Sequence, residues 1–94
     1  MRNEIKRAEA FKLAPDYVRF IEGDFDLFEA VETKFQKLKR GQACLTYRDN
    51  NFIKCKVSQV SHNDPRALDG PLVRVADHEG SWRVDGDKYA YPIE

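Results

Sequence analysis

The chain has 94 residues, of which 41% are hydrophobic and 12% aromatic, and its 16 Lys and Arg balance 16 Asp and Glu, so the formal net charge is zero. This length and composition predict one folded domain, residues 1–94, whose modest core needs neither a metal nor disulfides. The balanced charge argues against a general polyanion binder, which usually carries a basic excess. Any role with nucleic acid would therefore depend on a local patch.

The N-terminal segment MRNEIKRAEAFK is charged throughout and lacks the apolar core of a signal peptide. No apolar run in the sequence approaches the length that spans a membrane. We therefore expect a cytoplasmic protein without a membrane partner.

Residues 1–41 are predicted to be helical. Apolar residues at helical spacing favour a helix within residues 2–13. Pro15 is typical of the first turn of a helix and favours a short second helix at residues 16–22. The alternation of apolar and polar residues in this segment also permits a strand, so both interpretations stay open.

The clearest helix is predicted at residues 24–40. Asp24 is a suitable N-cap and Asp26 with Glu29 resembles a capping box, while Gly41 is a typical helix end. Acids gather at the start and bases at the end, as the helix dipole favours, so the basic end needs no ligand to explain it. One apolar stripe is predicted to face the core, formed by Phe28, Val31, Phe35 and Leu38.

Residues 42–94 are predicted to form antiparallel β structure that starts with a hairpin over residues 42–60. A three-residue loop at 49–51 places Leu45 opposite Cys55, whereas a two-residue loop would place Leu45 opposite Lys54. The apolar pattern on one face selects the longer loop.

This register predicts on which face of the hairpin each of the two cysteines lies. Cys44 and Cys55 are expected on opposite faces of the hairpin, with Cys55 in the core and Cys44 on the polar face. Side chains on opposite faces cannot form a disulfide, so both are predicted to be free thiols. Free thiols agree with a reducing compartment.

Three further strands are predicted in the C-terminal quarter of the chain. The turn at 77–80 places Val75 opposite Trp82 and Arg74 opposite Arg83. Asp85-Gly86 is a strong signal for a two-residue hairpin loop, and it places Trp82 opposite Tyr89 and Arg83 opposite Lys88.

The predicted fold class is α+β, with the helix at 24–40 packed on a sheet of four to five antiparallel strands. Short strands separated by regularly spaced turns resemble an SH3-like barrel over residues 42–92. One apolar sheet face is predicted to carry the core residues Ala43, Leu45, Tyr47, Ile53, Cys55, Val57, Val73, Val75, Trp82, Val84, Tyr89 and Tyr91.

The outward positions of the predicted strands carry six cations and no acid. Like charges on neighbouring strands are destabilising, which favours an anion-binding face for nucleic acid or an acidic protein surface. The alternative is a solvated face whose charge is balanced by acids in the turns. The candidate residues are Arg48, Lys54, Lys56, Arg74, Arg83 and Lys88, with Phe52 as the one outward aromatic residue.

No catalytic or metal-binding motif is evident. His62 and His78 lie in predicted loops beside acids, without the ligand spacing of a known zinc or calcium site. Cys44 lacks the accompanying groups of a catalytic nucleophile, and the sequence contains no glycine-rich phosphate loop. We expect no enzymatic activity, no cofactor, no metal and no small-molecule substrate.

These observations lead to two hypotheses about function. The leading one is a small non-enzymatic binding module for another protein or a second copy of itself, because Phe11, Phe20 and Phe25 are spare apolar residues that a partner would cover. The alternative is a nucleic-acid-binding module that uses the cationic set.

Overall fold

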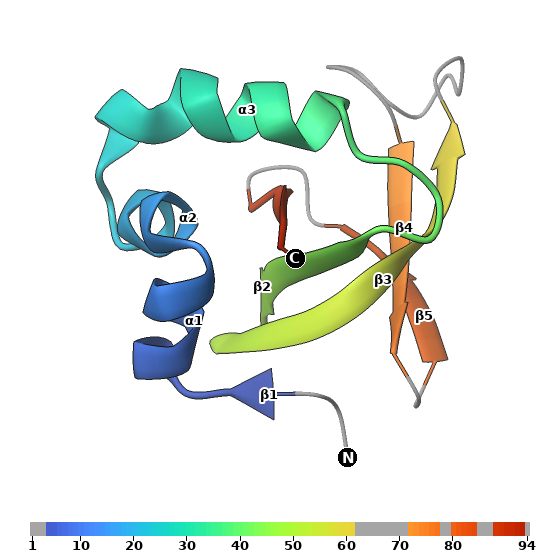
Figure 1. The fold of residues 1–94 in the computed structure, drawn as a ribbon, viewed down its shortest axis with the longest axis horizontal. Coiled ribbons are helices and arrows are strands. Elements are labelled where there is room, and N and C mark those ends of the chain that lie inside the picture. The colour runs from blue at the N-terminus through green and yellow to red at the C-terminus, as the bar shows by residue number, and fades with distance from the viewer. Residues whose placement is uncertain (1–3, 62–71, 78–79, 85–87, 94) are drawn as a thin grey trace.

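The computed structural model describes residues 4–61, 72–77, 80–84 and 88–93. It shows an α+β fold in which three α helices pack on a six-stranded antiparallel sheet (Figure 1). In chain order the elements are β1 (Glu4–Ile5), α1 (Arg7–Leu13), α2 (Pro15–Ile21), the 3-10 helix η1 (Phe25–Leu27), α3 (Phe28–Gln36), β2 (Ala43–Arg48), β3 (Asn51–Ser61), β4 (Leu72–Asp77), β5 (Gly80–Arg83) and β6 (Ala90–Pro92).

The helices agree with the predicted segments in part. α2 is a helix rather than a strand, and Pro15 occupies its first turn. The main helix is shorter than predicted, because α3 ends at Gln36 and tighter bonds such as Leu38 N–H to Phe35 C=O (3.2 Å) close its last turn. This early end keeps the Leu38 side chain buried while the chain turns towards β2.

The predicted caps of this helix are wrong. No side-chain cap hydrogen bond forms at the start of η1 or α3. The carboxylate of Asp24 instead accepts a hydrogen bond of 2.9 Å from the Arg19 guanidinium. The predicted buried stripe is confirmed for Val31, Phe35 and Leu38, but Phe28 is 44% exposed.

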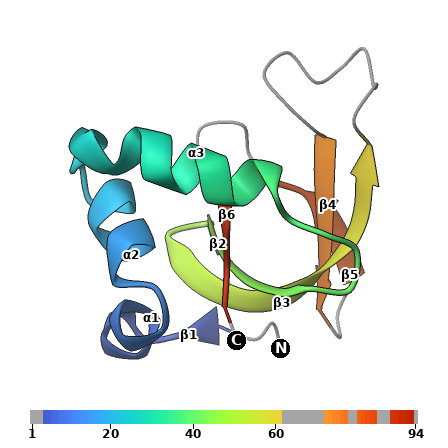
Figure 2. The ribbon, with the colours of Figure 1, turned by 45° about the horizontal axis from the view of Figure 1, so that its top comes forward.

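The strands lie in the order β5-β4-β3-β2-β6, and β1 pairs with the start of β3. β3 is long enough to pair with β1 near its first residues and with β4 from Lys56 onwards, and Figure 2 shows the bend between these parts. The register shifts between Val57 and Gln59, which marks a β-bulge. No pairing joins the described residues of β5 and β6, so the sheet is open rather than a closed barrel.

The hairpin of β2 and β3 has a two-residue loop, so the predicted three-residue loop is wrong. Asp49 and Asn50 both adopt positive φ, 53° and 66°, as a type I′ turn requires. Leu45 consequently pairs with Lys54, and Cys44 pairs with Cys55. The prediction that the two cysteines lie on opposite faces, with Cys44 on the polar face, is therefore wrong, because both are buried on the same face. The apolar pattern misled the prediction because both faces of β2 are buried, which removes the one-sided pattern that selects a register.

The last strand also differs from the prediction. The pairs of Val75 with Trp82 and Arg74 with Arg83 are confirmed. β6, however, pairs with β2 through Leu45 and Tyr91, so the predicted pairing of Trp82 with Tyr89 is wrong. The predicted loop at Asp85-Gly86 lies outside the described residues.

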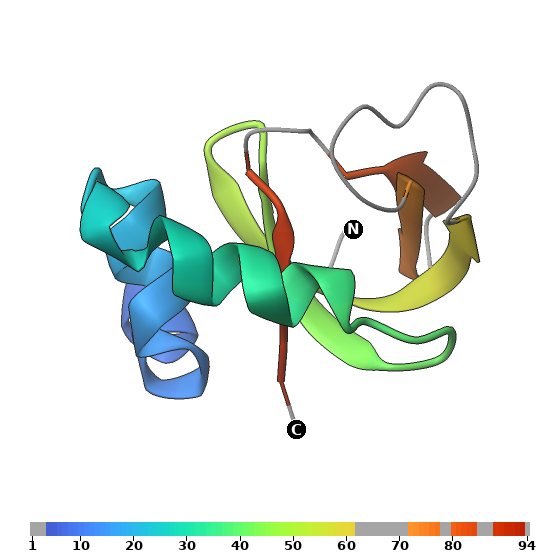
Figure 3. The same cartoon turned by 90° about the horizontal axis from the view of Figure 1, so that it is seen from above.

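Pairing with β2 brings β6 into contact with α3. Tyr91 packs 5.9 Å from the ring of Tyr17, between the helices and the sheet. α3 lies across β6, as the view from above shows (Figure 3), and the ring of Phe35 lies 5.0 Å from that of Tyr89. The helical layer thus provides the apolar contacts that select this edge of the sheet.

The predicted core residues are divided between two sheet faces rather than gathered on one. Leu45, Tyr47 and Tyr91 lie on the face towards α2, together with Phe52, which was predicted to point outward. Cys55, Val57 and Val75 lie on the other face, with Cys44, Ile53 and Trp82. That face curls so strongly that the guanidinium of Arg48 on β2 lies 4.9 Å from the ring of Trp82 on β5.

Candidate functional site

The predicted cationic face is reduced to four residues. Lys54 and Lys56 alternate with buried positions along β3, and Arg74 of β4 pairs with Arg83 of β5. Because Lys56 pairs with Ala76, two residues from Arg74, all four side chains share one sheet face. Arg83 and Lys56 are exposed, and Arg74 is half-buried.

The other three residues of the predicted set lie elsewhere. Arg48 is on the opposite face, against Trp82. Lys88 lies before β6 with its Nζ 6.0 Å from the ring centre of Tyr47, so its predicted place opposite Arg83 is wrong. Phe52 shares the face of Lys54 but is buried, because Tyr17 of α2 covers this end of the sheet with ring centres 6.3 Å apart.

Two of the four remaining cations have contacts within the chain. The Nζ of Lys54 lies 4.0 Å from a carboxylate oxygen of Glu9, and the guanidinium of Arg74 donates a 3.5 Å hydrogen bond to the Ser81 hydroxyl. Among the described residues, Lys56 and Arg83 are therefore the cations of this face that are exposed and have no such contact.

A second candidate surface is formed by exposed aromatic rings where α2 meets α3. Phe25 is 73% exposed and Phe28 is 44% exposed, and their ring centres lie 6.2 and 6.3 Å from that of Phe20. Phe20 itself is buried, so its predicted role as spare apolar surface is wrong. We refer to Phe25 and Phe28, supported by Phe20, as the aromatic corner.

The local sequence explains why this corner protrudes. Gly23 ends α2 with φ of 114°, a conformation that residues with side chains rarely adopt. The Phe25 N–H then donates to the Gly23 C=O at 3.0 Å, and the short η1 turns the chain into α3. Phe25 therefore lies on the outside of a tight connection, where its ring stays largely exposed beside that of Phe20.

The corner rests on a base of buried aromatic rings. The ring of Phe28 lies 5.9 Å from that of Tyr89, and Tyr89 in turn lies 6.1 Å from Phe20. Tyr89 is buried, and its hydroxyl donates a 3.3 Å hydrogen bond to the carboxylate of Glu32. The exposed rings of Phe25 and Phe28 thus stand on buried aromatic side chains.

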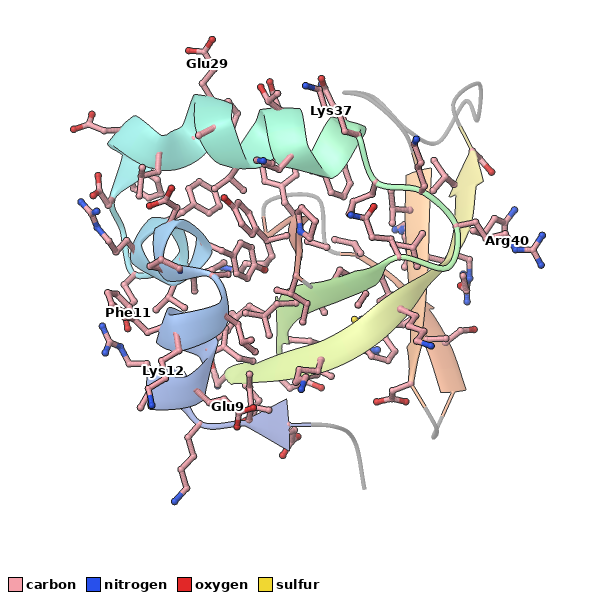
Figure 4. The ribbon with its side chains drawn as sticks, viewed as in Figure 1. Glu9, Phe11, Lys12, Glu29, Lys37 and Arg40 are labelled. Carbon is pink, nitrogen blue, oxygen red and sulfur yellow. The ribbon has the colours of Figure 1, made fainter. Side chains whose placement is uncertain are left out.

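The charge around the aromatic corner is negative. Asp24 is paired with Arg19, whereas Asp26 and Glu29 are exposed and form no ion pair within the described part of the chain. Glu29 points away from the body of the protein at the start of α3, and Lys37 does so near its other end (Figure 4). The apolar rings thus have an acidic rim.

Sequence reasoning found Phe25 but missed Phe28, Asp26 and Glu29. Phe28 continues the helical stripe of Val31 and Phe35, so its spacing indicated burial. The available signal was its position in the first turn of α3, directly after the irregular segment that begins at Gly23, where a stripe can extend past the core.

Exposed apolar side chains also occur on α1. Phe11 is 40% exposed and Leu13 is 37% exposed. The guanidinium of Arg7 lies 5.5 Å from the ring centre of Phe11 and also pairs with Glu22. The Arg7 hydrogen bond lowers the pKa of the Glu22 carboxyl below its usual value. The Arg7 guanidinium therefore partly covers Phe11, whereas Phe25, which contacts the ring of Phe20, stays 73% exposed.

The residues considered for metal binding do not form a site in the described structure. His62 and His78 lie outside the described residues. Within residues 4–61, 72–77, 80–84 and 88–93, no group of three or more His, Cys, Asp or Glu side chains could hold a metal ion. Across the same ranges, every helix is too short or too polar to cross a membrane.

Comparison with known proteins adds no functional information. No protein-family model, no curated protein and no solved structure matches this chain. Any inference about function therefore depends on the chemistry of the cationic sheet face and the aromatic corner.

Proposed function

We propose that this protein is a binding module for another protein and that the aromatic corner is its contact surface. The exposure of Phe25 on a buried aromatic base carries this proposal. Full burial of a Phe side chain contributes about 1.5–3 kcal/mol, and aromatic residues, Phe among them, are enriched at the cores of protein interfaces. Phe28 enlarges the apolar area next to Phe25.

The acidic rim specifies the chemistry of the partner. Asp26 and Glu29 carry negative charge that no cation in the described residues neutralises. A complementary surface would insert an apolar side chain between Phe25 and Phe28 and place Lys or Arg near the two carboxylates. Such charge complementarity adds specificity and speeds association. We therefore propose a partner segment that is apolar at its centre and basic at its edges.

Selection from a random peptide library displayed on phage tests this proposal without assuming a partner. Selected peptides are re-tested against Phe25→Ser and against the control Phe11→Ser, which removes a comparable ring from α1. We expect apolar peptides with flanking Lys or Arg that bind wild type and Phe11→Ser alike and bind Phe25→Ser at least about tenfold more weakly, a difference of about 1.4 kcal/mol. Peptides that bind Phe25→Ser as tightly as wild type would contradict the proposal.

Self-association is measured in the same samples. Sedimentation velocity of wild type and Phe25→Ser compares their oligomeric states across protein concentration. A dimer that dissociates in Phe25→Ser would identify a second copy as the occupant of the corner. A wild-type monomer would direct the search to other proteins.

A nucleic-acid role is the second candidate. Lys54, Lys56, Arg74 and Arg83 on one sheet face support it, because phosphate binding requires clustered cations. Titration into labelled single- and double-stranded DNA and RNA at low and high salt tests it beside Arg74→Glu/Arg83→Glu. Binding that weakens steeply with salt and disappears in the double variant would support this candidate. Absence of binding by wild type would remove it.

A further inference from the structure

Cys44 and Cys55 face each other across β2 and β3. They are paired residues in the strand register, their Sγ atoms lie 3.5 Å apart, and both side chains are buried. Both are free thiols in the structure. The two-residue loop at Asp49-Asn50 creates this arrangement, because a shift of one residue would place the sulfurs on opposite faces.

The backbone at this position is compatible with a disulfide. The Val57 N–H donates to the Gln42 C=O at 2.9 Å, so these residues are hydrogen-bonded across the strands. Hydrogen-bonded pairs alternate along an antiparallel ladder, which makes Cys44 and Cys55 the next such pair, with Cα atoms about 5.5 Å apart. Disulfides usually span Cα separations of about 4.4–6.8 Å, so the Cα spacing fits. Their Cβ atoms lie about 3.5–4.5 Å apart, closer than the roughly 4.5–5.5 Å between facing residues of antiparallel strands, so the two strands must also move together locally. The sulfurs need to approach by about 1.5 Å to reach bonding distance.

The surroundings favour a disulfide over a metal site. The hydrogen bond with Cys44 and burial raise the pKa of the Cys55 thiol far above its ordinary value. Metal ligation requires both sulfurs to stay ionised, which this environment disfavours. Attack on a peroxide needs only one transient thiolate, so oxidation of the pair is expected to be slow in the folded protein. The described residues also provide no third ligand.

We propose that Cys44 and Cys55 form a redox-responsive pair that a peroxide converts reversibly into a disulfide across the hairpin. One sulfur first attacks the peroxide, the O–O bond breaks, and a sulfenic acid and one water form. The second sulfur then attacks the sulfenic sulfur, the S–S bond forms, and the hydroxyl leaves with the thiol proton as a second water. Two electrons pass from the two sulfurs to the peroxide.

The crosslink would act on the centre of the sheet. Cys44 pairs with Pro92 of β6 on its other side, so the disulfide fixes the strand that joins the hairpin to the sheet edge. A crosslink stabilises chiefly by restricting the unfolded chain, and for a loop of this length the midpoint of thermal unfolding should rise by about 5–15 °C. This inference does not depend on the proposed partner.

The experiment treats the folded protein with hydrogen peroxide and measures free thiols, intact mass and thermal unfolding. We expect a monomer that loses both thiols and two hydrogen atoms, unfolds at higher temperature, and recovers its thiols with dithiothreitol. Peptide mapping should show Cys44 joined to Cys55. Cys44→Ser and Cys55→Ser are controls that should gain oxygen or form intermolecular dimers and show no stabilisation.

Three results would overturn the inference. Both thiols could survive peroxide in the folded protein, wild type could gain oxygen atoms without the loss of two hydrogens, or it could form only intermolecular dimers. The wild-type measurement alone separates these outcomes, so the inference stays testable where a Ser variant folds poorly.

Discussion

The hydroxyl of Tyr17 bridges β2 to the residue before β6, at the point where direct backbone bonding between the strands stops. It accepts a hydrogen bond of 3.0 Å from the Tyr47 N–H and donates one of 3.2 Å to the Tyr89 C=O. Tyr47 and Tyr89 are the next pair in the β2–β6 register after Thr46 and Ala90. The Tyr17 hydroxyl thus takes the place of a direct backbone hydrogen bond between Tyr47 and Tyr89. This bridge connects α2 both to β2 and to the residue before β6.

Tyr17→Phe should destabilise the protein by about 1–3 kcal/mol, because it leaves the half-buried Tyr47 N–H without its partner. The matched control is Tyr91→Phe, since the Tyr91 ring packs beside Tyr17 but no hydrogen bond holds its hydroxyl within the described residues. Urea unfolding measures both variants. Equal stability losses would contradict the bridging role of Tyr17.

The same hydroxyl predicts an alkaline limit to stability. Burial raises the pKa of Tyr17 far above the ordinary value of 10.0. Above pH 10 the unfolded chain loses the Tyr17 proton while the folded protein keeps it, so the free energy of unfolding falls as pH rises, by about 1.4 kcal/mol per pH unit from this group. Below pH 10 both states keep the proton, and the contribution is fully present.

Urea unfolding of wild type and Tyr17→Phe between pH 8 and pH 11.5 isolates the contribution of Tyr17 to this fall in the free energy of unfolding. The pKa of Cys55 is also raised, so Cys55 lowers the free energy of unfolding at high pH by a similar amount in both proteins. We therefore expect a steeper decline for wild type than for Tyr17→Phe above pH 10. Parallel curves would show that Tyr17 ionises equally in both states.

Tyr89 combines a buried ring with a positive φ of 56°. Tyr89→Ala should cost about 3–5 kcal/mol because it removes the ring that packs against Phe35 and Phe28. Tyr89→Phe should cost much less, since it removes the bond to Glu32 but keeps the ring. Tyr89→Gly should be at least as stable as Tyr89→Ala, because glycine adopts positive φ freely. A markedly less stable glycine variant would contradict this backbone conformation.

The register of the first hairpin can be tested at its loop. Asn50 has φ of 66°, so Asn50→Val should lower stability by about 1–2 kcal/mol. Asn51 is the first residue of β3 and is exposed, so Asn51→Val should be nearly neutral. A three-residue loop would reverse this order, with the larger loss at Asn51. Thermal unfolding of the two variants therefore distinguishes the registers.

The local elements were largely predictable from the sequence because local signals determine them. Pro15 and Gly23 bracket α2, and Val75 faces Trp82 across β4 and β5. The pairing of β6 with β2 was not predictable in this way. It depends on Tyr91 and Tyr89 packing against distant helices, and the Asp85-Gly86 signal carries no information about those contacts.

The candidate site shows the same limit. The alternation of side chains along β3 correctly placed Lys54 and Lys56 on one face. It could not show that α2 covers Phe52 on that face. The exposure of Phe28 likewise depends on how far α3 extends past the core. Both features follow from the packing of helices on the sheet rather than from residue spacing.

Nuclear magnetic resonance of the nitrogen-15-labelled protein, titrated with a selected peptide, tests the proposed contact surface most directly. We expect the largest amide shifts around Phe20, Phe25 and Phe28, and the loss of these shifts in Phe25→Ser. Shifts centred instead on Lys56, Arg74 and Arg83 would contradict a binding role for the aromatic corner and favour the cationic face.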